Sequence, residues 1–265
     1  MCWGSADFIG GYASKTTDSF LLAGVAHLSG LILMTSVAVW HGGAFPSHAN
    51  ATWAMAAGAS GGVALAIFYR ALASGKMGLN APVAAVLGAA IPVGVGFATE
   101  GFPHPLQIAG FILAVLGVWF ISKPDHLRGR PEGLGSALLA GLGFAGFYLF
   151  IRETGNTSAL WSAAFTRVAS LALVGAIVAV KASRTKLEHD LALAGIGAGI
   201  LDVSGTVFYI WASQSGRLDV AVVLVSLYPV ITVLLAKVFL KEHFTPVKIA
   251  GMVAALLAMP LIVFR

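Results

Sequence analysis

Apolar runs of about twenty residues follow one another through nearly the whole chain, with only short polar breaks between them. A helix needs about 20 such residues to cross about 30 Å of hydrocarbon. Hydrophobic residues make up 58% of the 265 positions and charged residues only 10%, which is more apolar surface than a soluble core could hide. The bilayer must therefore act as the solvent, and the sequence predicts an all-α integral membrane protein of the cell (inner) membrane.

The apolar runs and the turn signals between them predict ten transmembrane helices. They are expected at about residues 2–14, 20–40, 52–73, 77–98, 104–122, 133–151, 158–180, 190–213, 218–240 and 245–264. The first helix is short and carries Asp7, but it lacks the basic region of a cleaved signal peptide. We therefore interpret it as a structural helix.

A short motif occurs twice in the chain and indicates an internal duplication. Pro105–Gly110 and Pro246–Gly251 share Pro, Ile, Ala and Gly at the same positions, 141 residues apart. This offset predicts two repeats, at 1–124 and 131–265, each with five helices. Because five is an odd number, the two repeats must enter the membrane from opposite sides, which makes them an inverted repeat.

Composition and spacing argue against several other classes of protein. The single cysteine, Cys2, excludes an internal disulfide, and the seven histidines show none of the spacings of metal sites. We therefore expect no metal and no cofactor. The net charge of +5 comes from Lys and Arg that lie mostly in loops, where they set orientation and meet lipid headgroups rather than nucleic acid.

Basic residues are distributed unevenly between the predicted loops. Twelve of the 16 lie in odd-numbered loops, counted from the N-terminus, and three lie in even-numbered loops or at the C-terminus. The positive-inside rule then places the odd-numbered loops in the cytoplasm and both termini outside.

Several short motifs are typical of one transporter family. They are Trp3–Asp7, Ser226–Pro229, Leu240–Glu242, Phe244–Pro246 and Ile249–Gly251. With these motifs the chain resembles the drug/metabolite transporter (DMT) superfamily and, within it, the EamA-type exporters of small metabolites. The resemblance implies ten helices in two inverted five-helix halves, a central cavity and alternating access without ATP hydrolysis. It also implies cytoplasmic termini, in conflict with the charge distribution.

Three charged residues lie within the predicted helices and away from the ends of long spans, or, for Asp7, in the middle of the short first helix. A charge inside a membrane helix costs roughly 2.5–3.5 kcal/mol on insertion scales. Asp7 lies among glycines and is either a functional carboxylate or a helix-end group near the interface. Asp202 lies near the middle of its helix and could bind and release a proton. Arg167 is too deep to reach either interface, so it needs a partner: Asp202, Asp7 or a substrate carboxylate.

Aromatic and polar side chains on the same helices are candidates for contacts with a solute. Tyr69, Tyr148, Tyr209 and Tyr228 could stack on or hydrogen-bond a ligand with an apolar and a polar part, and Asn80 adds a polar edge. The competing interpretation is an aromatic belt at the membrane interface.

Three prolines are expected to interrupt helices and expose carbonyl groups at membrane depth. Pro82 and Pro92 lie in the fourth predicted helix and Pro229 in the ninth. Such breaks suit a hinge or gate, and the alternative is a static kink satisfied by neighbouring helices.

These features favour a secondary active transporter that exports a small metabolite, an amino acid or an amphipathic drug-like solute, with protons as the coupling ion. This hypothesis requires Asp7, Tyr148, Arg167 and Asp202 to converge on one cavity. The alternatives are an integral-membrane enzyme, for which no Gly-x-Ser-x-Gly or His-Glu-x-x-His motif is present, and a membrane scaffold that does not transport. The partners expected are a small-molecule substrate and the lipid bilayer.

Overall fold

The structure is a computed structural model that describes residues 1–122, 132–181, 188–241 and 245–263. Within these residues it is helical throughout, with no strand. The helices are α1 (Cys2–Ala13), α2 (Ser19–His41), α3 (His48–Ser74), α4 (Met77–Glu100), α5 (Pro105–Ser122), α6 (Leu134–Arg152), α7 (Ala159–Lys181), α8 (His189–Ser215), α9 (Leu218–Val225), α10 (Pro229–Leu240) and α11 (Pro246–Val263).

Some features of the sequence interpretation lie outside the described residues. The predicted limits of the two repeats at 124 and 131 are among them. So are several of the counted basic residues and two motif residues: Lys123, Arg128, Arg130, Arg184, Lys186, Arg265, Glu242 and Phe244.

Seven helical stretches of the described chain are long and apolar enough to cross a membrane, with α9 and α10 counted together. Two further apolar helices, α5 and α11, are shorter. The prediction of an all-α, multi-pass membrane protein is therefore confirmed for the part of the chain that the structure describes. At 12 residues, α1 is too short to span a bilayer alone, because it extends only about 18 Å.

Polar side chains and glycines set the limits of the helices. The Asp18 carboxylate accepts hydrogen bonds from the backbone N–H groups of Phe20 and Leu21 at the start of α2. Ser47 caps the first turn of α3 in the same way. Gly42 ends α2 with a φ of 70°, a left-handed conformation that glycine adopts without strain. These local signals explain why the helix limits could be predicted closely.

The prolines behave in two different ways. Residues 226–228 separate α9 from α10, and Pro229 begins α10, so the predicted interruption is present there. The predicted interruptions at Pro82 and Pro92 are wrong, because α4 is one continuous helix through both. Both rings are buried, and packing of α4 on α6 offsets the single backbone hydrogen bond that each proline removes.

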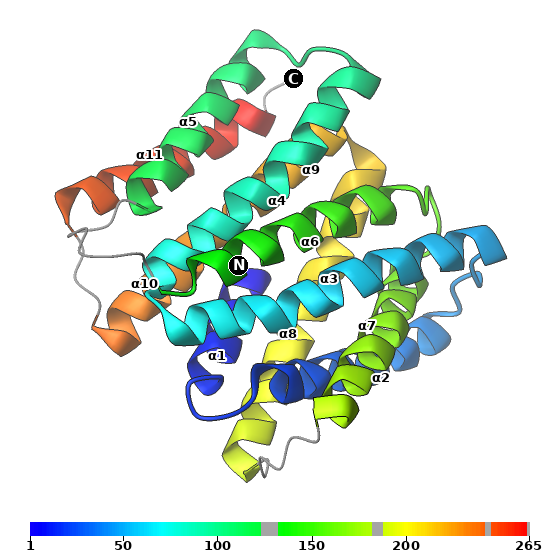
Figure 1. Ribbon diagram of the computed structural model, residues 1–265. Helices are drawn as coiled ribbons and strands as arrows, with labels where there is room; N and C mark the ends of the chain where they lie inside the picture. The colour runs from blue at the N-terminus through cyan, green and yellow to red at the C-terminus, as the bar shows by residue number, and fades with distance from the viewer. Residues whose placement is uncertain (123–131, 182–187, 242–244, 264–265) are drawn as a thin grey trace.

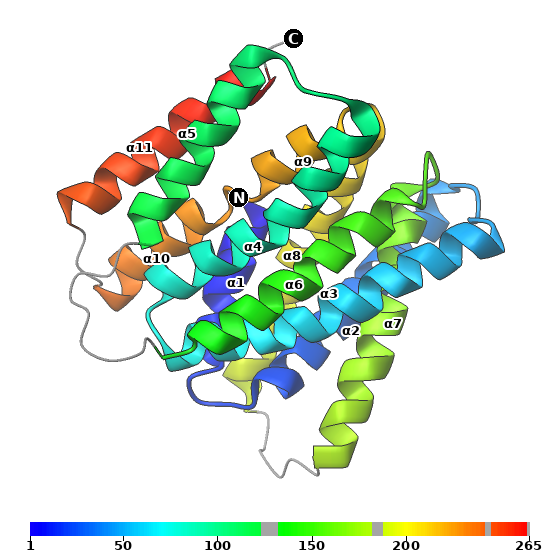
Figure 2. The same cartoon turned by 45° about the horizontal axis from the view of Figure 1, so that its top comes forward.

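The helices pack in matching pairs (Figures 1 and 2). α3 packs on α6 and α7, while α8 packs on α1 and α2. α5 and α11 lie side by side at one edge of the bundle, and α4 lies against α6, α9 and α10. α1 packs against α8, α3 and α10, and its Asp7 is buried among them.

Two glycines allow close helix crossings. A Cβ at Gly58 of α3 would overlap the backbone of Thr166 in α7, and a Cβ at Gly199 of α8 would overlap the carbonyl oxygen of Ala26 in α2. Both crossings therefore bring backbones together as small residues do in membrane helices. These glycines therefore serve helix packing between α3 and α7 and between α8 and α2.

Candidate solute-binding site

A cavity lies inside the bundle between α1, α3, α6, α7, α8 and the break that precedes α10. It is narrow, with a cavity volume of about 50 Å³. Five residues that the sequence singled out line it: Asp7, Tyr148, Arg167, Asp202 and Tyr228. The expected convergence of Asp7, Tyr148, Arg167 and Asp202 from four separate helices is therefore present, and Tyr228 joins them from the break between α9 and α10.

Arg167 forms the predicted ion pair with Asp202. Its Nη1 lies 2.9 Å from Oδ2 of Asp202, and both side chains are nearly buried. Its Nη2 donates to the hydroxyl of Thr206 at 2.7 Å, one turn further along α8. The Nε of Arg167 is buried without a hydrogen-bond partner. The guanidinium is thus held on α8 by two contacts, with one donor unused.

His27 belongs to this network, although the sequence interpretation gave it no role. Its Nε2 lies 3.3 Å from the carbonyl oxygen of Gly62, and its Nδ1 lies 3.3 Å from Nη1 of Arg167. Because a guanidinium only donates, Nδ1 must accept and Nε2 must carry the proton, so the ring is the neutral tautomer. An ionisable residue in the middle of the apolar run 20–40 was the signal that could have identified it.

Asp7 differs from Asp202 because its carboxylate has no recorded partner. The residue is only 4% exposed and lines the cavity. Among the described residues, no hydrogen bond or ion pair to its carboxylate is recorded, and Asp202 is close enough to repel it electrostatically. The two aspartates and one arginine therefore leave the cavity with one uncompensated negative charge when all three are ionised.

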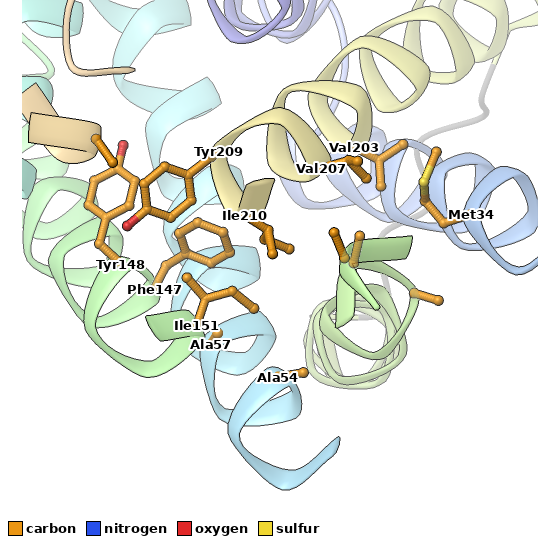
Figure 3. Packing of buried hydrophobic residues seen from close by; sticks show 14 of the residues in the cluster. Met34, Ala54, Ala57, Phe147, Tyr148, Ile151, Val203, Val207, Tyr209 and Ile210 are labelled. Atoms are coloured by element: carbon orange, nitrogen blue, oxygen red, sulfur yellow. The ribbon is translucent and has the colours of Figure 1, made fainter. Parts of the chain in front are cut away.

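Aromatic rings form one wall of the cavity around Trp3. The Trp3 ring contacts the rings of Phe147, Tyr148, Tyr209 and Tyr228 at centroid distances of 5.9 to 6.4 Å. Figure 3 shows Phe147 and Tyr148 of α6 beside Tyr209 of α8, in the apolar cluster that supports this wall. The rings form an apolar surface beside the charged groups.

Hydrogen bonds fix the position of Trp3 and leave two tyrosine hydroxyls unused. The indole N–H of Trp3 donates to the carbonyl oxygen of Asp202 at 2.9 Å, which ties α1 to α8. The hydroxyls of Tyr209 and Tyr228 are buried without a partner. Tyr228 lines the cavity, whereas Tyr209 lies behind it. Tyr228 therefore contributes to the cavity wall and keeps a buried hydroxyl without a partner.

Two other predicted site residues do not line the cavity. Tyr69 is fully buried, its ring packs over Gly10 of α1, and its hydroxyl has no partner. Asn80 donates through Nδ2 to the carbonyl oxygens of Ala71 and Glu132, at 2.7 and 3.1 Å. Asn80 therefore holds the turn between α3 and α4 against the segment before α6, which is a structural position.

A second charged cluster joins the C-terminal ends of α4 and α6 to the start of α9. Glu100 accepts from Arg152 at 2.8 Å, and Arg217 donates to Asp219 at 2.8 and 3.0 Å. Arg217 also donates to the carbonyl oxygens of Glu100 and Gly101. The hydrogen bonds to Asp219 raise the pKa of Arg217 above its ordinary value. We refer to Glu100, Arg152, Arg217 and Asp219 as the end cluster.

The described helices and the cavity among them define a multi-pass helical membrane protein with a charged internal site. A family model described as the EamA-like transporter family matches residues 132–264, half of the chain. The chain belongs to the EamA-like transporter family, in agreement with the resemblance seen in its sequence. This membership indicates a membrane transporter of the DMT type that acts on a small molecule, and it is consistent with a protein that is not an enzyme.

Solved structures with the same fold are known. Twenty-eight chains match. One of them, titled only "Crystal structure of protein", superposes with a TM-score of 0.75, covers 97% of each chain and is 18% identical. At this identity the likeness supports the fold alone. No curated protein matches the chain.

Proposed function

We propose that this protein is a secondary active transporter that exports a small metabolite, an amino acid or an amphipathic drug-like solute across the cell (inner) membrane. The observation that carries the proposal is a cavity with one unpaired carboxylate, Asp7, beside the paired Arg167 and Asp202 and a wall of aromatic rings. Such a cavity offers both an apolar surface and a charge to one solute.

Ten helices in two inverted halves would give this cavity access to each side of the membrane in turn. The limits of the helices support the duplication, because α8 begins and ends 141 residues after α3, and α11 does so after α5. The close crossings support it too, since Gly58 and Gly199 are also 141 residues apart and each meets a helix of the other half. Helix pairs in one half therefore have counterparts in the other.

Proton coupling is the finer part of the proposal, and Asp7 is its main candidate. A proton on Asp7 removes the uncompensated charge of the cavity without breaking an existing ion pair. The Arg167 guanidinium has two acceptors on α8 in the structure, Asp202 and Thr206. A proton on Asp202 would weaken the attraction between Asp202 and Arg167 and so release the guanidinium from one of them. Either aspartate could therefore exchange a proton against a solute, and Asp7 would do so with the smaller rearrangement.

The test is uptake of radiolabelled solutes into proteoliposomes, with and without a pH gradient. The variants are Asp7→Asn and Asp202→Asn, and the matched control is Asp190→Asn, because Asp190 is an exposed carboxylate at the start of the same helix as Asp202. We expect the gradient to drive flux in the unaltered protein and in Asp190→Asn, and to lose its effect in Asp7→Asn.

The other outcomes of this assay distinguish proton coupling from transport itself. Flux that ignores the pH gradient in the unaltered protein contradicts proton coupling and leaves transport standing. Absence of flux for amines, amino acids and amphipathic solutes alike, in protein that remains folded, favours the alternative of an enzyme or a scaffold that does not transport.

A further inference from the structure

Another cavity lies outside the central site, where the turn between α1 and α2 meets the ends of α3 and α7. Its cavity volume is about 330 Å³. Three basic residues and one acidic residue line it: Lys15, Arg70, Lys181 and Asp18. Their formal charges sum to +2.

The acidic residue does not neutralise the basic ones. The Asp18 carboxylate accepts hydrogen bonds from the N–H groups of Phe20 and Leu21, at 2.9 and 3.1 Å, and its charge is therefore directed at the start of α2. The ammonium group of Lys181 lies 3.8 Å from the centre of the Phe20 ring, which holds it in place by a cation–π interaction. Among the described residues, no ion pair to Lys15, Arg70 or Lys181 is recorded.

Two hydroxyl groups at the wall of this cavity are unused. The Oγ of Ser14 and the Oγ1 of Thr17 are buried without a hydrogen-bond partner. Buried polar groups normally have a partner in the protein or in a bound molecule. A group with several oxygen acceptors and a negative charge would suit both the hydroxyls and the cations.

The position of the cavity relative to the membrane spans restricts the kinds of ligand that could reach it. Its walls include the first residue of the span in α2, the last turn of the span in α3 and the last residue of α7. It therefore lies where the spans end, at the level of lipid headgroups. Lys15, Lys76 and Lys181 lie at this end, and the charge distribution predicts that it faces the cytoplasm, where anionic lipids are enriched.

We propose that this cavity binds a phosphate group at the membrane surface. The Arg70 guanidinium presents a fork of donors suited to phosphate oxygens, while Lys15 and Lys181 supply point charges. Ser14 and Thr17 donate their unused hydroxyls. The phosphate belongs either to an anionic phospholipid or to a free phosphate anion, since both present the same oxygens.

The experiment measures thermal unfolding of the full chain in a neutral detergent with two probes. One is short-chain phosphatidylglycerol below its micellar concentration, with the matching phosphatidylcholine as reference, and the other is inorganic phosphate. We expect one probe to raise the melting temperature in a saturable way. Arg70→Gln should weaken its apparent affinity about fivefold, the equivalent of about 1 kcal/mol for one basic contact.

Lys76→Gln is the matched control, because Lys76 is exposed at the same end of the molecule and does not line the cavity. It should leave the apparent affinity unchanged. Ser14→Ala is the second variant: it removes a small buried hydroxyl and should reduce the ligand effect while the unliganded protein melts at the same temperature or higher.

The two probes distinguish the source of the phosphate. Saturation by phosphatidylglycerol alone assigns the site to a lipid, and saturation by inorganic phosphate assigns it to a free anion. An equal loss of affinity in Lys76→Gln and Arg70→Gln overturns the proposal in favour of general surface charge. No saturable shift with either probe also overturns it.

Discussion

The central site and the end cluster contain similar charged groups in different balance. The end cluster has two carboxylates and two guanidinium groups, and each charge has an opposite partner within 4.0 Å. The central site has two carboxylates and one guanidinium, and Asp7 is the carboxylate with no recorded partner. A balanced cluster holds helices together, whereas an unbalanced one keeps a charge available for a proton or a solute.

The two regions also differ in what they join. The end cluster links α4 of the first half to α6 and to the turn before α9 in the second half. The central network links α2, α7 and α8 around His27 and Arg167. Because both networks connect the two halves, movement of one half against the other must strain at least one of them. The end cluster is the more exposed network, so we expect it to break more easily.

The largest effect is expected at the buried pair. Arg167→Met leaves the Asp202 carboxylate buried without its partner and should destabilise the protein by about 3–5 kcal/mol. Thermal unfolding in detergent measures it. The double variant Arg167→Met with Asp202→Asn should recover most of the loss, because the carboxylate that Arg167 neutralises is then removed as well. Equal instability of the single and double variants would show that packing, and not charge, is what Arg167 provides.

A smaller loss of stability is expected for the pair of Arg217 and Asp219, in which only Asp219 is buried. Asp219 is 0% exposed, and Arg217→Gln removes its guanidinium while the N–H of Val220 still donates to it. We expect a loss of about 1–3 kcal/mol in the same unfolding measurement. The control is Asp219→Asn combined with Arg217→Gln, which should be more stable than Arg217→Gln alone. If Arg217→Gln lost as much stability as Arg167→Met, the central site and the end cluster would not differ in how strongly their charged pairs stabilise the protein.

The smallest effect is expected at the exposed pair of the end cluster. Arg152 and Glu100 keep 30% and 21% of their side-chain surface exposed, so Arg152→Gln should cost about 1 kcal/mol or less. Because such a pair is screened by salt, the difference from the unaltered protein should shrink as ionic strength rises. A difference that is independent of salt would mean that Arg152 contributes through packing.

Helix positions were predictable from the sequence because run length, caps and turn residues are local signals. Pairing of Arg167 was predictable as well, since a charge at that depth must find a partner. Which face each helix turns inward was not predictable, because lipid is as apolar as the protein core and both faces of a spanning helix look alike. Tyr69, Asn80 and Tyr209 show a second limit: all three are fully buried, but none of them lines the cavity, because the neighbour that a buried side chain meets depends on contacts between distant segments.

The end cluster was missed for a related reason. Glu100, Arg152 and Arg217 lie at helix ends, where the sequence suggested only interfacial charges. Their pairing depends on the approach of three segments that are far apart in the chain, and no local pattern encodes it. Pro82 and Pro92 were expected to break α4 because the compensating contacts with α6 are also non-local.

The measurement that tests the central claim most directly compares Asp7→Asn with Glu100→Gln in two assays on the same preparations. One assay is thermal unfolding, and the other is solute flux driven by a pH gradient in proteoliposomes. The account predicts that Asp7→Asn melts at or above the temperature of the unaltered protein and loses the response to the gradient, whereas Glu100→Gln melts lower and keeps that response. The opposite pattern, with a destabilised Asp7→Asn that still responds to the gradient, would contradict it.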